Sequence, residues 1–260
     1  MSGSASGRPP RVFVVLPAFN EEANLGGLLE RLDEAMAESG LPYDVIVVDD
    51  GSRDGTAELV RRLAERLPIE VITHPQNLGL GATTRDGLVR AAERASPRDV
   101  IVTMDADETH TPGLILRMLR MLREGHDVVI ASRFQSGARV FGVPWHRRLM
   151  TVAASLVFRL LFPTPGVRDF TCGYRAYRGA VLKEAIARYG PRFVEEDGFQ
   201  CMVDILLKLR ELPLVFGEVP LILRYDLKQG KSKMDVWRTA RRTLALVLRR
   251  RLGRAADRSA

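Results

Sequence analysis

The chain has 260 residues, of which 46% are hydrophobic and 27% are charged. These values fit one large globular domain with a well-buried core, and they exclude a chain that is disordered throughout. The only two cysteines, Cys172 and Cys201, lie far apart and form no CxxC pair. That spacing argues against a disulfide framework or a zinc site and fits a reducing compartment.

The net charge of +7 is concentrated at the C-terminus. Residues 224–260 contain twelve Lys/Arg and three Asp, a net charge of +9, so residues 1–223 carry 7 − 9 = −2. Such a basic tail could contact nucleic acid, an anionic membrane surface or a phosphate-bearing substrate. Residues 1–10 are small and polar, which predicts a disordered leader without a signal peptide. No stretch reaches the roughly 20 apolar residues that span a bilayer.

The first half of the chain alternates between apolar, β-branched runs and segments with helical spacing. Apolar runs predict strands, and amphipathic segments predict helices. We expect strands at 12–16, 45–48, 71–74, 100–104 and 128–131, and helices at 23–39, 56–67, 82–95 and 114–124. This alternation predicts an α/β fold with a parallel, doubly wound sheet covered on both faces.

The second half is less regular. It predicts, in chain order, an amphipathic helix at 147–162, a polar loop or strand at 168–177, a helix at 203–212, a strand at 215–223, a basic loop at 230–233 and an arginine-rich helix at 236–251. The two basic helices could lie in a membrane interface or be core helices with a solvated basic face. We expect a leader (1–10), one domain (11–235) and a basic helix and tail (236–260).

Polar clusters follow five of the predicted strands, at 20–22, 49–52, 77–81, 105–110 and 132–133. Ligands of such sheets bind at the carboxyl ends of the strands. Within the fourth cluster, Asp105 and Asp107 follow a strand at i and i+2, so their carboxylates should point the same way. Such a pair would repel unless a cation such as Mg²⁺ or Mn²⁺ joined it, together with substrate phosphate oxygens.

The second and third clusters suit a nucleotide. A carboxylate at a strand end, such as Asp50, can accept from a nucleobase edge or a ribose hydroxyl. Gly79 and Gly81 allow close backbone approach. The chain has neither GxGxxG nor GxxxxGK[ST], which disfavours a Rossmann NAD enzyme and a P-loop NTPase.

Five motifs occur in an order that resembles family-2 glycosyltransferases with the GT-A fold. They are Leu16-Pro17-Ala18-Phe19-Asn20-Glu21, the run 49–56, the run 77–81, Asp105-Ala106-Asp107 and Ala131-Ser132-Arg133-Phe134. Within that family the chain resembles the dolichyl- or polyprenyl-phosphate mannose (or glucose) synthases, over about residues 11–235. The resemblance implies a GDP- or UDP-hexose donor, a polyprenyl phosphate acceptor, and a cytoplasmic enzyme peripheral to the cytosolic face of an anionic membrane.

The resemblance also implies roles for individual residues. It implies metal binding by Asp105 and Asp107, and it implies phosphate contacts by Arg133, Arg175, Arg224 and Lys233. It implies nucleotide-sugar contacts by Pro17, Phe19, Glu21, Val48, Asp50, Asp105, Ala106 and Asp107. General chemistry agrees with the phosphate contacts, because cations stabilise a diphosphate leaving group and arginine forks bind a phosphate acceptor.

Two departures from the family pattern concern the metal and the phosphates. Thr109 stands where the group often has Gln as a further metal ligand, so the Thr109 hydroxyl or a water would have to serve. The adjacent Glu108 is an extra carboxylate that should face the opposite way. The insert 225–232 between Arg224 and Lys233 is longer than the group leads us to expect.

The acidic run Glu195-Glu196-Asp197 separates two hypotheses about the acceptor. It stands where many family members carry a general base. A phosphate acceptor is already ionised near neutral pH, so Asp197 would then orient the acceptor. A hydroxyl acceptor, such as a saccharide, would need Asp197 as a true base.

A third hypothesis is a nucleic-acid-binding protein that uses the basic tail. That class predicts aromatic residues among the basic ones, but none follows Trp237. It also leaves the acidic strand ends without a role. We therefore expect no nucleic-acid partner.

Overall fold

The structure is a computed structural model, and it describes residues 8–227, 241–242, 245–247 and 249–250. A seven-stranded sheet lies at its centre, in the order β3-β2-β1-β4-β7-β5-β8. Its strands are β1 (Val12–Ala18), β2 (Tyr43–Asp49), β3 (Ile69–Thr73), β4 (Val100–Thr103), β5 (Val128–Ser132), β7 (Arg175–Arg178) and β8 (Phe216–Pro220). β7 runs antiparallel to β4 and β5, whereas the other neighbours are parallel. The predicted α/β fold is confirmed, with one antiparallel strand that the pattern did not predict.

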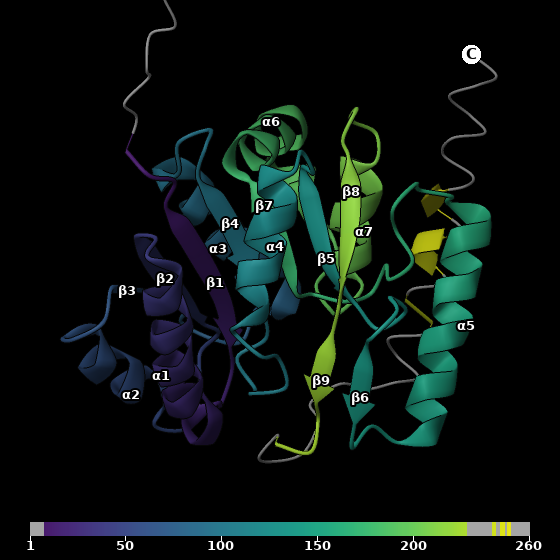
Figure 1. The fold of residues 1–260 in the computed structure, drawn as a ribbon. Helices are drawn as coiled ribbons and strands as arrows, with labels where there is room; N and C mark the ends of the chain where they lie inside the picture. The colour runs from purple at the N-terminus through teal and green to yellow at the C-terminus, as the bar shows by residue number, and fades with distance from the viewer. Residues whose placement is uncertain (1–7, 228–240, 243–244, 248, 251–260) are drawn as a thin grey trace, which may run out of the picture.

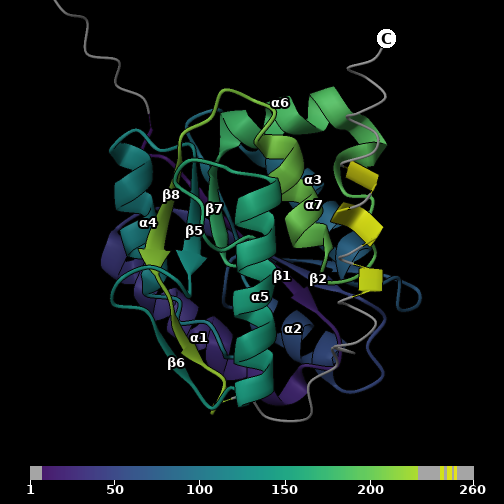
Figure 2. The same cartoon turned by 90° about the vertical axis from the view of Figure 1, so that its right-hand side faces the viewer.

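Helices cover both faces of this sheet (Figures 1 and 2). One face carries α1 (Glu22–Ser39), α2 (Thr56–Ala64) and α4 (Leu114–Arg123), and the other carries α3 (Leu80–Arg94), α6 (Gly179–Tyr189) and α7 (Cys201–Leu209). A short 3₁₀ helix, Gly190–Phe193, follows α6. Because both faces are covered, consecutive residues of the central strands are buried whichever way they point, as in β1, where Val12 to Leu16 are at most 1% exposed.

A small subdomain lies beside this body. β6 (Arg139–Phe141) pairs in parallel with β9 (Ile222–Arg224), and α5 (Trp145–Leu161) runs along the β8 side (Figure 1). The predicted strand 215–223 is thus two strands, β8 and β9, which belong to different sheets. Only Ser155 and Phe158 of α5 are buried.

Parts of the C-terminal prediction lie outside the described residues, including Lys233 and the basic loop 230–233. Of the predicted helix 236–251, residues 241–242, 245–247 and 249–250 are described and helical. Leu246 and Val247 are buried, at 2% and 4% exposed. No helix among the described parts of the chain is long and apolar enough to cross a membrane.

Candidate active site

The first two sequence motifs meet at the carboxyl edge of the sheet. β1 and β2 run in register, with Ala18 opposite Asp49, so the loops that follow them emerge together. Asn20 accepts a hydrogen bond from the backbone N–H of Arg53 at 2.7 Å. One step along, the N–H of Glu21 donates to the Thr56 hydroxyl at 2.8 Å. These contacts join the two predicted nucleotide-binding loops into one surface.

The third motif is held against the second by Asp50. Its carboxylate accepts hydrogen bonds from the backbone N–H groups of Leu78 and Gly79, at 2.8 and 2.9 Å. The buried His74 side chain lies 2.7 Å from the same carboxylate and 3.1 Å from Asp86. Asp50 is 3% exposed and holds the loop 77–81 in place, while its direct nucleotide contact stays a prediction. His74 ends the predicted third strand, and no sequence motif marked it.

The Val48 side chain lies in the core. It is fully buried and lies against α3, where a Cβ on Gly87 would come within 3.1 Å of a Val48 methyl group. A nucleotide contact of Val48 would therefore have to use its backbone, and it stays a prediction. Pro17 and Phe19 are half-buried at the end of β1, while Glu21 is 8% exposed and accepts from the Asn24 amide at 2.7 Å.

Asp105 and Asp107 follow β4, as predicted, and two neighbouring side chains organise them. The Thr109 hydroxyl donates to Asp107 Oδ1 at 2.6 Å, so Thr109 orients this carboxylate. His110 accepts from the N–H of Asp105 through Nδ1, at 3.1 Å. This leaves the ring proton on His110 Nε2, which lies 3.8 Å from the Asp105 carboxylate. Ala106, between the two aspartates, is 3% exposed.

His110 is a site residue that sequence reasoning missed. It is 4% exposed and stacks on Tyr174, with ring centroids 4.9 Å apart. Its only signal in the sequence is its place five residues after Asp105. The stacking fixes the imidazole, and the imidazole fixes the backbone on which the aspartate pair is mounted.

Glu108 directs its side chain to helix α1. Its backbone has a φ of +61°, and its carboxylate forms an ion pair with Arg31 of α1 at 2.9 Å. The described residues contain no group of three or more His, Cys, Asp or Glu side chains that could hold a metal ion. Asp105 and Asp107 supply carboxylate oxygens, which are the ligands that Mg²⁺ and Mn²⁺ prefer.

Arg133, at the end of β5, is held by a buried carboxylate. Its Nε and Nη2 donate to Asp169 at 2.8 and 2.6 Å, and Nη2 also donates to the Thr171 hydroxyl. Burial raises the pKa of the Asp169 carboxyl, but the adjacent guanidinium lowers it more, so its pKa lies below the ordinary value. The Arg133 side chain remains 21% exposed. Asp169 thus holds the Arg133 side chain at the edge of the site. The sequence did not reveal this role of Asp169.

Arg175 does not lie where the resemblance implied. It is fully buried in β7 and donates to the backbone carbonyls of Cys172, Met202 and Phe170 at 2.8, 2.6 and 2.8 Å. All its nitrogens are therefore used inside the core. The predicted phosphate contact of Arg175 is wrong for this structure.

β9 brings Arg224 to the aspartate pair. The N–H of Arg224 donates to the carbonyl of Thr109 at 2.9 Å, so the strand passes directly beside the loop after β4. The guanidinium pairs with Asp226 at 2.8 Å and lies over the Phe141 ring. The backbone of Arg224 thus lies beside the loop that carries Asp107, its phosphate contact stays a prediction, and Lys233 is outside the described residues.

The acidic run lies against the loop 77–81. The carbonyl of Asp197 accepts from the N–H of Gly81 at 2.8 Å. A Cβ on Gly81 would come within 1.8 Å of the Glu196 carbonyl oxygen, so only glycine permits this approach. The Asp197 residue is exposed, while Glu196 is 9% exposed and pairs with Arg249. Glu195 is exposed as well, but its carboxylate pairs with Lys208 at 2.9 Å.

Fold and site together define a glycosyltransferase of the GT-A type. The chain matches the family model for glycosyl transferase family 2 over residues 13–185. It is 33% identical to a dolichol-phosphate mannosyltransferase of Pyrococcus furiosus over 80% of its own length and 56% of the relative. It therefore spans a little more than half of that relative. The chain belongs to glycosyl transferase family 2.

Two further relatives match over most of their length. A polyprenol monophosphomannose synthase of Mycolicibacterium smegmatis is 32% identical, with 86% of this chain and 81% of the relative covered. An undecaprenyl-phosphate mannosyltransferase of Micrococcus luteus is 35% identical, with 86% and 88% covered.

Among solved structures, the fold is similar to that of glucosyl-3-phosphoglycerate synthase from Mycobacterium tuberculosis. The TM-score is 0.65 at 21% identity, with 94% of this chain and 80% of the other covered. That enzyme was solved with UDP and Mn²⁺ and also with UDP and Mg²⁺. The likeness supports the GT-A fold.

Proposed function

We propose that this enzyme transfers a hexose, of mannose or glucose type, from a GDP- or UDP-sugar to a polyprenyl phosphate. The observation that carries the proposal is the pairing of the Asp105–Asp107 loop with Arg224 at one edge of the sheet, with Arg133 fixed at the end of β5. The names of the three relatives support a polyprenyl phosphate acceptor, and they favour mannose among the hexoses.

In this proposal Asp105 and Asp107 would hold Mg²⁺ or Mn²⁺, and the bound cation would supply positive charge to stabilise a nucleotide diphosphate leaving group. Thr109 orients Asp107 through its hydroxyl. Pro17, Phe19, Glu21 and Ala106 lie close to the nucleotide. Arg133 and Arg224 bind phosphate oxygens of the acceptor or donor, as arginine forks do.

The test is a transfer assay with radiolabelled GDP- and UDP-hexoses, with polyprenyl phosphate in detergent as one acceptor and soluble saccharides as the other. We expect label to appear in the organic phase with one of these donors. Label only on a saccharide would overturn the phosphate acceptor and favour the second candidate, a family-2 transferase with a hydroxyl acceptor. This second candidate is supported by Asp197, which is exposed and could act as its general base.

Replacing Asp197 with asparagine separates the two acceptors. A phosphate oxygen is already ionised near pH 7, so Asp197→Asn is expected to retain most of its kcat. A hydroxyl acceptor needs a base, whose removal typically costs about 10²-fold or more. The comparison of kcat for the variant and the wild type is the measurement, and a loss of that size would contradict the phosphate acceptor.

The exposed face of α5 supports a place on a membrane surface. Trp145, Leu149, Val152, Leu156 and Leu160 follow one another at spacings of three and four residues, and they are 53–76% exposed. Residues with this spacing form one stripe of a helix. An apolar stripe of this kind, with arginines on the same helix, fits the interface of an anionic bilayer.

We expect Leu149→Gln/Leu156→Gln to weaken vesicle binding at least about tenfold, because an inserted leucine contributes about 1.5 kcal/mol or more. Co-sedimentation with anionic vesicles measures the effect. Val215→Gln is the control, since Val215 is also 53% exposed but lies outside α5. Equal losses in both variants would contradict a membrane role for the stripe.

A further inference from the structure

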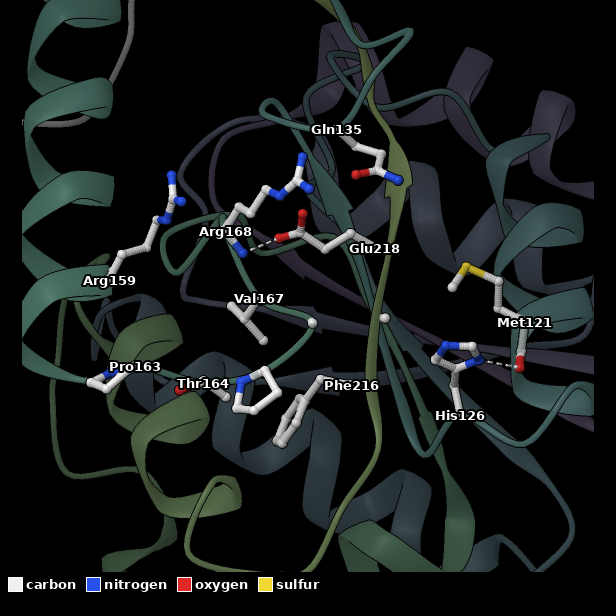
Figure 3. A pocket seen from close by; sticks show the side chains of 13 residues that line it. Met121, His126, Gln135, Arg159, Pro163, Thr164, Val167, Arg168, Phe216 and Glu218 are labelled. Carbon is white, nitrogen blue, oxygen red and sulfur yellow. Dashed lines mark hydrogen bonds between the residues drawn. The ribbon is translucent and has the colours of Figure 1, made fainter.

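A cavity of about 630 Å³ opens between α5, the loop 163–168 and β8 (Figure 3). It contains none of the residues that we assign to donor, metal or acceptor. Its apolar wall includes Met121, Val167 and Phe216, and its polar lining includes Gln135, Arg159, Arg168 and Glu218. The cavity therefore combines an apolar wall with two guanidinium groups.

The loop that carries Arg168 is rigidly held. Glu218, which is 8% exposed, accepts hydrogen bonds from the N–H groups of Arg168 and Asp169 at 2.6 and 2.7 Å. Gly166 has a φ of +79°, and a Cβ there would lie 2.2 Å from the Phe216 carbonyl oxygen. A site whose backbone is fixed before binding loses less entropy when a ligand enters.

The guanidinium groups of Arg159 and Arg168 are available to bind an anion. No described residue forms an ion pair with either side chain. Within the described part of the chain, the Arg168 side chain donates one long bond of 3.4 Å to the Phe134 carbonyl, and both arginine residues are exposed. In Figure 3, Arg168 lies between Arg159 on the helix and Glu218. Glu218 is the only acidic lining residue, and its carboxylate is turned to the backbone of 168–169.

The position of Arg159 links the cavity to the exposed stripe of α5. Arg159 lies three residues after Leu156 and seven after Val152, so it borders the stripe on the helix surface. A guanidinium between an apolar stripe and a cavity can bind a phosphate while carbon chains lie along the stripe. The apolar wall suits the glyceryl or alkyl part of such a molecule.

We propose that this cavity is a second anion site, which binds the phosphate group of a phosphate ester through Arg159 and Arg168. The ester can be a phospholipid headgroup or a soluble glycerol phosphate, since both present the same group. The site does not depend on the transfer reaction, so binding at the cavity can fail or succeed independently of the proposed function.

The test compares two variants of equal charge in two binding assays. Arg159→Ala/Arg168→Ala removes the site, and Arg117→Ala/Arg120→Ala removes two exposed arginines of α4 that do not line the cavity. Vesicles of 30% phosphatidylglycerol in phosphatidylcholine are compared with pure phosphatidylcholine. A soluble arm follows the backbone NMR signals of Gly166, Val167 and Gly217 during titration with glycerol phosphate.

We expect the cavity variant to lose about tenfold or more of its preference for phosphatidylglycerol, from the loss of two basic side chains near the surface, while the α4 variant loses distinctly less. Cavity signals that shift with glycerol phosphate in wild type but not in the cavity variant, without any vesicle preference, would assign the soluble ester. Equal losses in both variants would reduce the preference to general electrostatics and, without cavity shifts, overturn the proposal. An absence of effect in both arms would overturn it as well. Thermal unfolding of each variant confirms that the fold is retained.

Discussion

Replacing Asp107 with alanine is expected to reduce kcat more than about 100-fold while the protein stays folded. Mutation of a residue that only hydrogen-bonds to a metal ligand typically lowers metal affinity or activity about 10–100-fold. Mutation of a residue that binds the metal directly should lower activity more. Asp107 is half-buried in a loop after β4, and its carboxylate accepts from the N–H and the hydroxyl of Thr109, so we expect the core to tolerate its replacement. Turnover measured across a series of Mn²⁺ concentrations, with circular dichroism for the fold, checks the expectation.

Glu108→Gln is the matched control for this experiment. Glu108 is the next carboxylate along the chain, but it pairs with Arg31 on α1. Its loss should leave both kcat and the Mn²⁺ dependence close to those of the wild type. Full activity of the wild-type enzyme in EDTA would contradict the metal role of the pair, whatever the variants do.

The central sheet could be predicted because its strands are buried on both faces. A strand covered on both sides must be apolar at every position, so β1, β2 and β5 are visible as continuous runs. The same double coverage buries the Val48 side chain.

The elements that were missed lack local signals. β6 is three residues long and half-exposed or exposed throughout, so no alternation marks it. α6 (Gly179–Tyr189) was not predicted either. The antiparallel direction of β7 depends on its place between β4 and β5, which are distant in sequence.

The site residues divide in the same way. Asp105 and Asp107 could be placed at the sheet edge because they directly follow a buried apolar strand, and their metal role stays a prediction. Arg175 was misplaced because a buried arginine is rare, and its partners include a carbonyl 27 residues away. Positions that depend on remote partners, such as Asp50 with Leu78 and Gly79, need the fold before their role can be read.

Asp169→Ala is expected to destabilise the protein by about 3–5 kcal/mol, the usual cost of removing one partner of a buried ion pair. Asp169 is fully buried, and its carboxylate also accepts from the N–H groups of Arg133, Thr171 and Cys172. The variant would leave Arg133 charged beside an apolar side chain and leave those N–H groups without an acceptor. Urea unfolding followed by circular dichroism measures the change.

Lowering the pH should weaken the ion pair between Asp169 and Arg133 in the wild-type protein. The folded-state pKa of Asp169 lies below its ordinary value, so its contribution is complete above the unfolded pKa of about 3.9 and declines as the pH falls through the lowered folded value. Asp169→Ala should therefore lose less stability in strong acid than the wild type does.

A double-mutant cycle with Arg133→Ala distinguishes the ion pair from a general packing defect. If the guanidinium and carboxylate stabilise one another, the sum of the stability losses of the two single variants should exceed the stability loss of the double variant. The reason is that the second replacement removes a charge that the first left unpaired. Asp226→Ala, which removes the exposed partner of Arg224, should leave the free energy of unfolding nearly unchanged. Additive losses at Asp169 and Arg133 would contradict the coupling on which the placement of Arg133 at the site depends.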